Sequence, residues 1–391
     1  MKRTKIIWFT LPVVLIWMYS CTKSADKSTC HVTVKCDIDG SCRINRLSQV
    51  CDSVTAIPLQ PNEKALLGVI DKIQMDDHHI CILSNNKCFI YDSEGHFKNL
   101  IDKMGHAKFE YVYIDDICLT SGNIILADAQ SKKILVFSQN GKPLEEIKVD
   151  FFPERIMAVN DSIVAVSCGG NQGSRLIVYH IKNRKVLQEH FEYDDRFLWP
   201  IPQTFVKSAQ GVLYKQPYSN IYYSIAPQGN VAKAYCIDFG KYRFSAADLK
   251  ETDLLGNKIL QDSKGNAQIL RLLETKHYFC VEFVCTRLSE DGQFIILVNK
   301  TTNKCLLLDS ETYKDDLLHG NYRVLPDFSE SYGESFVGVI DPQLWKENLK
   351  KEGTPIKDKN DLKLTSVLQH CDDLAPIICV YHIKQEISAQ N

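Results

Sequence analysis

A repeat of about 45 residues constrains the fold of this chain more than any other feature of its sequence. Residues 71–83 form an apolar segment, a polar turn and a second apolar segment, and a similar stretch begins 44 positions later at Asp115. Two further apolar segments flank a glycine, which is Gly95 in the first copy and Gly141 in the second. Four short strands in a unit of about this length are typical of one blade of a β-propeller.

Weaker copies of the unit continue along the chain. The strand-like segments of the third unit are 163–167 and 176–181. Those of the fourth unit are 211–214, 221–225 and 231–239, and those of the fifth are 278–287, 294–298 and 304–309. A sixth unit has to combine 336–340 and 377–383 with an early strand near 54–59. Borrowing that strand would close the ring and leave no open sheet edge. We therefore predict an all-β fold, a six-bladed β-propeller over residues 54–384, with a C-terminal tail at 385–391.

Two stretches break the strand pattern. Residues 245–273 have helical character, because Ser245 stands three residues before Asp248 and Gln268–Leu273 is rich in helix-forming residues. Residues 341–368 begin with Asp341 and Pro342, which suit the N-cap and first position of a helix. We predict short helical insertions in both places, since a separate helical domain would need more residues.

The N-terminus has the pattern of an export signal. Three cations in the first five residues precede an apolar run at 6–18, which is too short to span a bilayer comfortably. The run ends in Met18-Tyr19-Ser20-Cys21, which resembles a bacterial lipobox except at Tyr19. We predict that residues 1–20 are a lipoprotein signal peptide and that Cys21 carries the lipid. The alternative is an ordinary cleaved signal, with Cys21 as one thiol among many.

This prediction places the protein in the cell envelope, anchored to the outer membrane at its periplasmic face or at the cell surface. Removal of residues 1–20 takes away three cations and changes the formal net charge from −2 to −5. No basic patch stands out, so nucleic acid is not expected as a partner. The membrane, reached through the lipid, is the expected partner at the N-terminus.

Fifteen cysteines are many for an exported chain. Four of them, Cys30, Cys36, Cys42 and Cys51, crowd residues 21–53, which we predict to be a cysteine-rich tether. Disulfides there would stabilise a segment with little core of its own, and the sequence leaves open whether they form. No Cys-x-x-Cys pair occurs, so a zinc ribbon or a thioredoxin-type motif is not supported.

Several motifs carry a resemblance to a known family. These are Ile57-Pro58-Leu59 followed by 66–73, the turn 91–97, and a closing segment at 372–384. Residues 105–111 match a G-x-G-P-G-E-Y loop at Gly105, Glu110 and Tyr111 but lack its central Gly-Pro-Gly. The chain resembles the six-bladed β-propeller lipoproteins of Bacteroides and relatives, which are related to NHL-type propellers. The resemblance implies the fold and the anchor, and it implies no particular reaction.

Propellers bind ligands where inner strands and connecting loops converge on the central channel. Asp71 and Asp115 begin equivalent units, so they could line the channel and help to hold a cation. The alternative, which we favour, is that they cap turns by accepting backbone hydrogen bonds. Glu110 and Tyr111 lie between two units, where ordering of the loop is favoured over contact with a ligand.

Two other clusters are candidates. His78 and His79 follow two aspartates, and a solvated hairpin tip is favoured over a metal site. Arg196 and Trp199 precede the fourth unit, where they could stack on a sugar or a peptide or could simply pack between blades.

Two classes of function follow. The favoured class is a binding or interaction module for a protein, peptide or glycan. The alternative is a metal-assisted hydrolase or lyase with its site at the channel mouth, and catalytic residues are not assigned. No nucleophile elbow, HExxH motif or phosphate-binding glycine loop occurs. We expect no cofactor, and a calcium or other divalent ion in the channel is left open.

Overall fold

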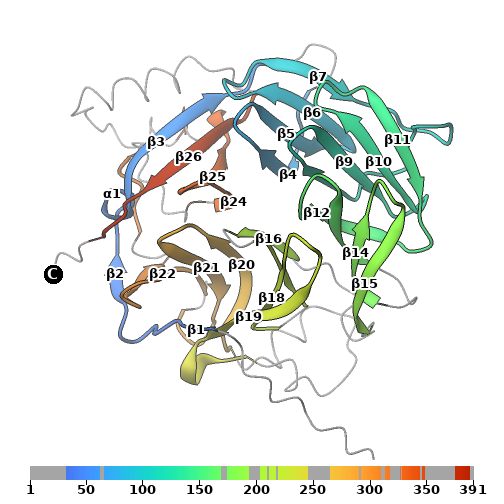
Figure 1. Ribbon diagram of the computed structural model, residues 1–391. Coiled ribbons are helices and arrows are strands. Elements are labelled where there is room, and N and C mark those ends of the chain that lie inside the picture. Colours follow the sequence, from blue (N-terminus) through green and yellow to red (C-terminus); the bar gives the residue numbers. More distant parts are fainter. Residues whose placement is uncertain are drawn as a thin grey trace, which may run out of the picture.

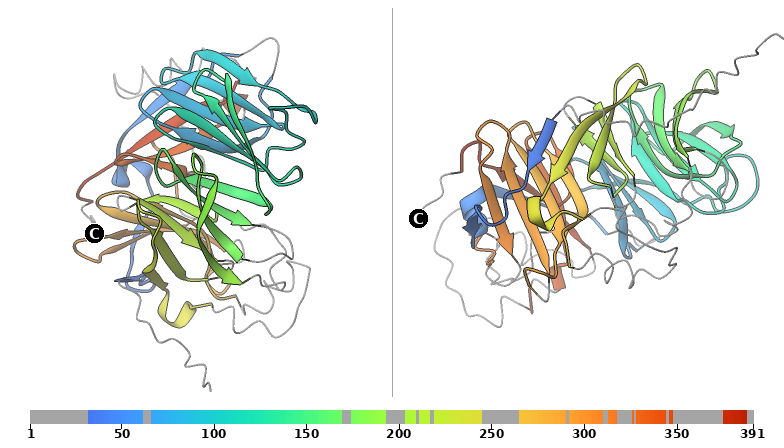
Figure 2. Two further views of the ribbon diagram at one scale, coloured as in Figure 1. Left: turned by 45° about the vertical axis from the view of Figure 1, so that its right-hand side comes forward. Right: turned by 90° about the horizontal axis from the view of Figure 1, so that it is seen from below.

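Six β-sheets surround a central axis like the blades of a propeller, as the computed structural model shows (Figure 1). The side views show a disc whose sheets stand around that axis (Figure 2). The structure describes residues 32–61, 66–168, 174–192, 203–208, 211–216, 219–244, 265–289, 292–309, 313–317, 326, 328–343, 346–347 and 375–387. The predicted fold class is therefore confirmed.

The first three blades follow one another along the chain, and each has four antiparallel strands. Blade 1 contains β4 (Ile70–Met75), β5 (His79–Ser84), β6 (Lys87–Asp92) and β7 (Phe97–Ile101). Blade 2 contains β8 (Asp116–Leu119), β9 (Asn123–Asp128), β10 (Lys133–Ser138) and β11 (Pro143–Lys148). Blade 3 contains β12 (Pro153–Ala158), β13 (Ile163–Cys168), β14 (Ser174–His180) and β15 (Lys185–Glu192).

The other three blades include strands from the N-terminal segment. Blade 4 contains β16 (Phe205–Ser208), β17 (Gly211–Lys215), β18 (Ile221–Ile225) and β19 (Val231–Asp238), with β1 (Val32–Lys35) at its outer edge. Blade 5 contains β20 (Gln268–Glu274), β21 (Tyr278–Val284), β22 (Gln293–Asn299) and β23 (Cys305–Asp309), with β2 (Cys42–Ile44) outside. Blade 6 contains β24 (Phe328–Tyr332), β25 (Ser335–Ile340), β26 (Ile377–Ile383) and β3 (Cys51–Pro58). Short helices occur at α1 (Leu47–Val50) and at the 3-10 turn η1 (Gly240–Tyr242).

The second strand of each of the first three blades is buried almost throughout. β5, β9 and β13 read His-Ile-Cys-Ile-Leu-Ser, Asn-Ile-Ile-Leu-Ala-Asp and Ile-Val-Ala-Val-Ser-Cys, with buried side chains on both faces. A strand that is covered on both faces needs apolar residues in succession rather than in alternation. The core therefore lies between neighbouring blades, as where Ile125 of blade 2 shares a cluster with Val164 of blade 3.

The borrowed strand closes the ring as predicted. β3 pairs antiparallel with β26, and Ala56 lies opposite Cys379. His382 reinforces the closure, because its Nε2 lies 2.9 Å from the Thr55 hydroxyl and its Nδ1 lies 3.1 Å from the Ser335 hydroxyl. The imidazole thus links three of the four strands of the closing sheet, β25, β26 and β3. Among the described residues no helix is long and apolar enough to cross a membrane.

Residues 32–53 differ from the expected tether. β1 pairs parallel with β19 and β2 pairs parallel with β23, so the segment runs around the outside of blades 4 and 5 before it closes blade 6 (Figure 1). Ile44 and Leu47 are buried there against blades 5 and 6. The physical reason is that the segment covers sheet edges that would otherwise be unpaired. We call residues 32–50 the outer strap.

The three described cysteines of this segment are free thiols. Cys36 and Cys51 are buried in different clusters, and Cys42 is partly exposed. Burial raises the pKa of both buried thiols well above the ordinary value. Disulfides among these three residues are therefore absent, and Cys30 lies outside the described residues. The structure uses the buried thiols as small apolar side chains.

One predicted helix is a strand. Gln268–Leu273 belongs to β20, the inner strand of blade 5, because its apolar side chains pack against β21 and neighbouring blades. Tertiary packing here outweighs the helix propensity of its leucines. Residues 245–264 lie outside the described residues. In the second insertion residues 342–343 and 346–347 are helical, and Asp341 Oδ1 accepts a hydrogen bond from the Gln343 N–H at 2.8 Å.

Candidate functional site: the central channel and its mouth

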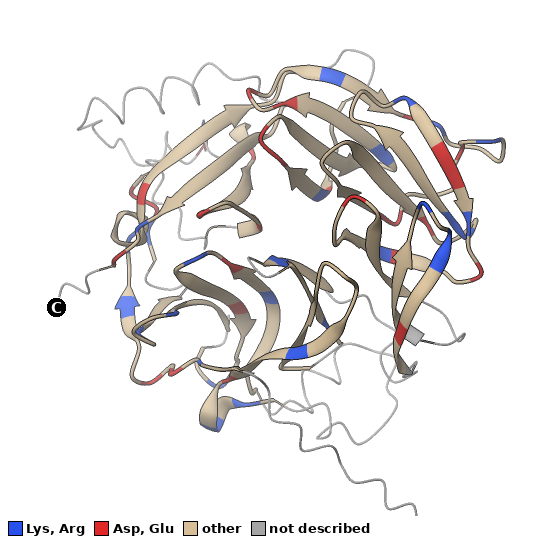
Figure 3. Ribbon diagram, in the orientation of Figure 1, with Lys and Arg blue, Asp and Glu red and all other residues tan. Residues whose placement is uncertain are grey.

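The inner strands enclose a cavity of about 420 Å³, which we call the channel pocket. All six blades contribute to its wall, and residues of both charge signs surround the central axis (Figure 3). Each blade contributes at least one charged side chain, and these include Lys72, Asp116, Arg155, Lys207, Arg271 and Glu330. The pocket lies toward the ends where the inner strands begin, and we call that side of the disc the entry face.

Bulges in the inner strands place several of these charges. The strand register shifts immediately before Lys72 in β4, Arg155 in β12, Arg271 in β20 and Glu330 in β24. A bulge bends its strand and redirects the side chain that follows. Each of these four strands thereby turns one charged residue toward the pocket.

Two ion pairs with buried carboxylates and partly exposed lysines cross between blades. Lys72 Nζ lies 2.7 Å from Asp116 Oδ1, whose carboxylate also accepts the Ile117 and Ile156 N–H groups at 2.9 and 2.8 Å. Asp116 therefore joins blades 1, 2 and 3. Lys207 of blade 4 lies 3.6 Å from Glu330 of blade 6, on the other side of blade 5.

The Glu330 carboxylate interacts with side chains from opposite sides of the channel. Gln74 of blade 1 donates its Nε2 hydrogen to this carboxylate, which also faces Lys207. Burial raises the pKa of Glu330, although Lys207 and Lys72 act to lower it. The Oε1 atom of Gln74 is buried and has no hydrogen-bond partner in the described part of the chain. The pocket therefore retains one unused acceptor at its wall.

Asp71 and Asp115 both line this pocket. Asp115 Oδ2 accepts the Ala129 N–H at 2.7 Å, which is the capping role that we favoured from the sequence. Desolvation raises the pKa of Asp115 to about 6, against the effects of that hydrogen bond and of Arg155. Desolvation also raises the pKa of Asp71, again opposed by Arg155. Arg155 Nη1 donates to the Asp115 carbonyl oxygen at 2.8 Å.

A second hollow of about 530 Å³ adjoins the mouth between blades 6 and 1, and we call it the mouth groove. It shares Asp71, Lys72 and Arg271 with the channel pocket. Its remaining wall is partly apolar, with Leu67, Ile70, Val339, Pro342 and Pro376. Leu66 and Val69 are neighbours in the chain of its lining residues and are 64% and 79% exposed, and Tyr113 of the channel pocket is 45% exposed. Ionic and apolar groups thus meet at one opening.

Glu110 and Tyr111 order their loop. The carboxylate of Glu110 accepts the Ala107 N–H at 2.8 Å, and the fully buried Tyr111 hydroxyl lies within 3.2 Å of Ile101 O, Asn86 O and Lys103 N. A Cβ at Gly105 would meet the Glu110 carboxylate, so the glycine permits this close approach. Neither residue lines the channel pocket or the mouth groove.

The aspartate–histidine cluster serves as an inter-blade contact. Asp76 Oδ1 accepts the N–H groups of His78 and His79 at the turn, at 2.9 and 2.8 Å. Asp77 accepts the Tyr332 hydroxyl of blade 6 at 2.8 Å. The candidates Cys21, Arg196 and Trp199 lie outside the described residues.

Most charged residues of the channel pocket were not predicted from the sequence. The repeat aligned Asp71 with Asp115, but no matching acid was identified in the third unit. The structure places Glu154 at the corresponding bulge of β12, because the spacing shortens from 44 to 39 residues. Charged residues inside otherwise apolar strand segments were the available signal, as at Lys72, Arg155 and Arg271.

The channel acids do not form a cluster of metal ligands. Among the described residues, the one group of three His, Cys, Asp or Glu ligands within 4.8 Å of one another is Asp92, Glu94 and His96. That group lies at the turn between β6 and β7, and Lys98 already pairs with Asp92 at 2.7 Å. The pairing of channel acids with lysines instead suits recognition of polar groups.

Residues 34–382 match a family described as a domain of unknown function, DUF4934. The chain belongs to this family. The match begins within β1, so the outer strap is part of the family's domain. Among curated proteins, none matches this sequence.

One solved structure shares the fold. A Bacteroides fragilis protein described as exported is 17% identical, with a TM-score of 0.68, and the match covers 90% of this chain and 99% of that one. A member of the DUF4221 family from Bacteroides vulgatus is 9% identical, with a TM-score of 0.48, and the match covers 86% of this chain and 98% of that one. The first likeness supports the six-bladed architecture.

Proposed function

We propose that this DUF4934 protein is a non-catalytic binding module of the cell envelope that receives its ligand at the entry face. The observation that supports this proposal is the channel pocket. All six blades contribute charged side chains to its wall, and the wall as a whole holds both positive and negative charges. The wall is held in place by ion pairs and hydrogen bonds between blades, as at Asp116. A rigid pocket of this kind loses little entropy when a ligand binds.

The ligand classes expected from the sequence are a protein, a peptide and a glycan, and the mouth favours a polypeptide. Leu66, Val69 and Tyr113 offer apolar contact beside the charged mouth. A polypeptide segment brings apolar side chains and charges together, whereas a neutral glycan brings mainly hydroxyl groups. We place the ligand's polar end in the channel pocket and its apolar groups along the mouth groove.

The proposed location rests on the N-terminal sequence. Residues 1–20 would direct export, and acylation of Cys21 would hold the propeller at a membrane. The exported description of the Bacteroides fragilis protein is consistent with this location. The chain between Cys21 and Val32 would connect the anchor to the outer edge of blade 4.

The alternative function is a metal-assisted hydrolase or lyase at the channel mouth. Such a reaction needs several ligands that converge on one point. In the described part of the chain Asp71 and Asp115 belong to no such group. Elemental analysis of the purified protein tests this alternative directly, and a stoichiometric calcium or zinc lost in a mouth variant would support it.

The binding proposal is tested by selecting ligands from a random peptide library and from a glycan array with the purified mature domain. Selected ligands are then measured against Tyr113→Ala and Asp71→Asn. Each variant has a matched control away from the mouth, Leu144→Ala on β11 and Asp52→Asn on β3, because both control residues are exposed.

We expect Tyr113→Ala to raise Kd about tenfold or more, as for a buried aromatic contact in an interface, and the controls to leave Kd unchanged. Peptide ligands that bind the controls and the mouth variants equally would contradict the proposed site. Selection of glycans alone, with the same dependence on Tyr113, would retain the site and reject the polypeptide ligand.

A further inference from the structure

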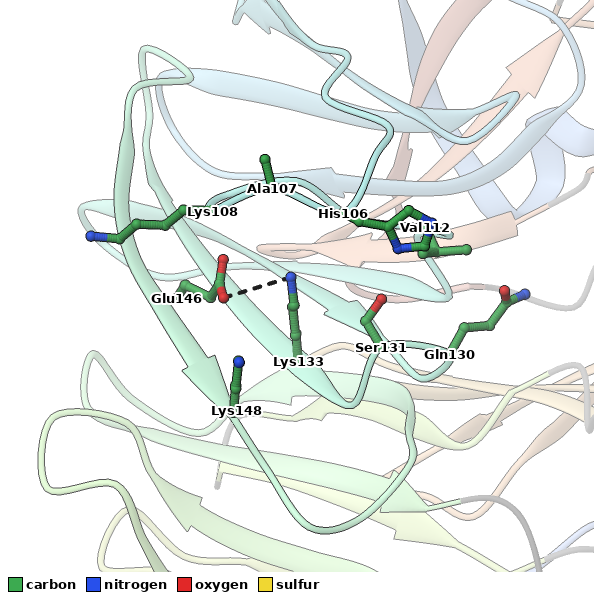
Figure 4. A pocket seen from close by; sticks show the side chains of 9 residues that line it. All are labelled: His106, Ala107, Lys108, Val112, Gln130, Ser131, Lys133, Glu146 and Lys148. Atoms are coloured by element: carbon green, nitrogen blue, oxygen red, sulfur yellow. Dashed lines mark ion pairs between the residues drawn. The ribbon is translucent and has the colours of Figure 1, made fainter.

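A third hollow, of about 630 Å³ and with a polar wall, lies away from the channel on the outer part of blade 2 (Figure 4). The loop that leads into blade 2 covers one side of it with His106 and Lys108. The turn between β9 and β10 and the ends of β10 and β11 form the other side, with Ser131, Lys133, Glu146 and Lys148. We call this hollow the lysine pocket.

Two lysines face each other across a strand pair in this pocket. Lys133 of β10 lies directly opposite Lys148 of β11 in the antiparallel register. Directly opposed side chains project from the same face of a sheet with their Cβ atoms about 5 Å apart, and like charges in this arrangement repel each other. Lys133 is buried, so solvent screens its charge less than that of an exposed lysine. The fold therefore carries a repulsion that an anion would relieve.

The one carboxylate in the pocket cannot neutralise both lysines. Glu146 Oε1 lies 3.6 Å from Lys133 Nζ, and Glu146 Oε2 accepts the Phe109 N–H at 2.6 Å. In the described part of the chain Lys148 has no ion pair with any residue, Glu146 included. Lys133 and Lys148 against Glu146 leave a formal excess of one positive charge inside the pocket, and Lys108, which extends outward, adds a second at its rim.

Neutral donors complete the wall. Figure 4 shows the ends of Lys133 and Lys148 on the same side as Glu146, with the Ser131 hydroxyl beside them and His106 across the opening. Lys108 extends outward, and its ammonium group lies 4.8 Å from the centre of the Phe109 ring. Two ammonium groups, a hydroxyl and an imidazole thus approach one space from different directions. Such donors suit an anion with several oxygens better than a planar carboxylate.

We propose that the lysine pocket binds a sulfate or phosphate group. A tetrahedral oxyanion would bridge the opposed lysines and offset the positive excess of the pocket. The group could belong to a small sulfated or phosphorylated molecule or to a phospholipid headgroup, and both sources share this chemistry. The pocket is separate from the channel, so this proposal stands whether or not the channel mouth binds a polypeptide.

The test measures thermal unfolding of the mature chain carrying Cys21→Ser, which removes any acyl group. Sodium sulfate and sodium phosphate are titrated against sodium chloride at equal ionic strength. The variant is Lys148→Gln, and the matched control is Lys142→Gln, which removes the same charge from the exposed turn at the other end of the same two strands.

We expect each oxyanion to raise the Tm of the parent chain and of Lys142→Gln by about 2 °C at ten times Kd, relative to chloride. Lys148→Gln should lose this rise, and its Tm without oxyanion should equal or exceed that of the parent because the repulsion is gone. An equal rise in Lys148→Gln, or no rise in the parent chain, would overturn the proposal. A lower Tm for Lys148→Gln without oxyanion would overturn the repulsion argument.

A flotation assay then separates the two sources. Vesicles of phosphatidylglycerol are compared with vesicles of phosphatidylcholine, using the same three chains. Flotation with phosphatidylglycerol that requires Lys148 assigns the site to a lipid headgroup. A response to the inorganic oxyanions without such flotation assigns it to a soluble or sugar-borne group.

Discussion

Lys215 offers a test of how the interior of this propeller tolerates charge. It is the last residue of β17 and is 2% exposed. Its Nζ donates one hydrogen bond, to the Ile269 carbonyl oxygen of blade 5 at 2.9 Å, and no carboxylate in the described part of the chain pairs with it. Burial lowers the pKa of Lys215 from 10.5 to about 7. We predict that Lys215→Met stabilises the protein at neutral pH.

The magnitude follows from the shift in pKa. A displacement of the pKa from 10.5 to about 7, at 1.36 kcal/mol per unit, makes burial of this lysine cost about 4 kcal/mol at pH 7, where the folded side chain is partly neutral. The methionine removes that cost but leaves the Ile269 carbonyl without its donor, which costs about 1–3 kcal/mol. The expected net gain in the free energy of unfolding at pH 7 is therefore about 2 kcal/mol.

The sign of the pH dependence is fixed by proton binding. Between pH 7 and pH 10 the unfolded chain keeps a proton on Lys215 that the folded chain has lost, so stability rises with pH. This one residue should raise the free energy of unfolding by about 2 kcal/mol between pH 7 and pH 9. Below pH 7 both states are protonated and the full cost of the buried charge remains.

The assay is urea unfolding of the parent chain and Lys215→Met at pH 7 and pH 9, with a reductant to keep the thiols free. Other titrating groups are common to both proteins, so the difference between them isolates Lys215. The advantage of the methionine variant should shrink or reverse at pH 9. A difference that is the same at both pH values would refute the argument from a buried, neutral lysine.

Three further predictions concern the anchor, the strap and the channel wall. Cys21→Ala should release the protein from the membrane fraction, and labelled fatty acid that still attaches to this variant would contradict the anchor. Ile44→Ala should lower the free energy of unfolding by about 2–4 kcal/mol because the side chain is 1% exposed in the outer strap, whereas Val32→Ala should change it little. An Ile44→Ala variant with an unchanged free energy of unfolding would mean that the outer strap is a tether, as the sequence predicted. Asp116→Ala should cost about 3 kcal/mol or more by leaving Lys72 unpaired, and Lys72→Met in the same background should recover part of that loss in urea unfolding.

The local pattern of apolar residues was enough to predict the ring. Each blade buries its second strand between two neighbours, so runs such as Ile80–Leu83 recur at similar spacing and can be recognised without knowledge of their contacts. The closing strand β3 could be predicted as well, because the last blade would otherwise have an unpaired sheet edge. The equivalence of Asp71 and Asp115 followed from the same regular spacing.

Tertiary structure alone decided the outer strap, the strand β20 and the charged channel wall. β1 pairs with a strand that lies about 200 residues further along the chain, and no local pattern records so distant a parallel partner. Gln268–Leu273 has helix-forming residues, and only packing between blades makes it a strand. Bulges rotate Lys72, Arg155 and Arg271 toward the axis, where each charge meets a partner from another repeat or another strand. The sequence by itself therefore determined that a six-bladed ring forms, and the closed ring decided which charges face one another within it.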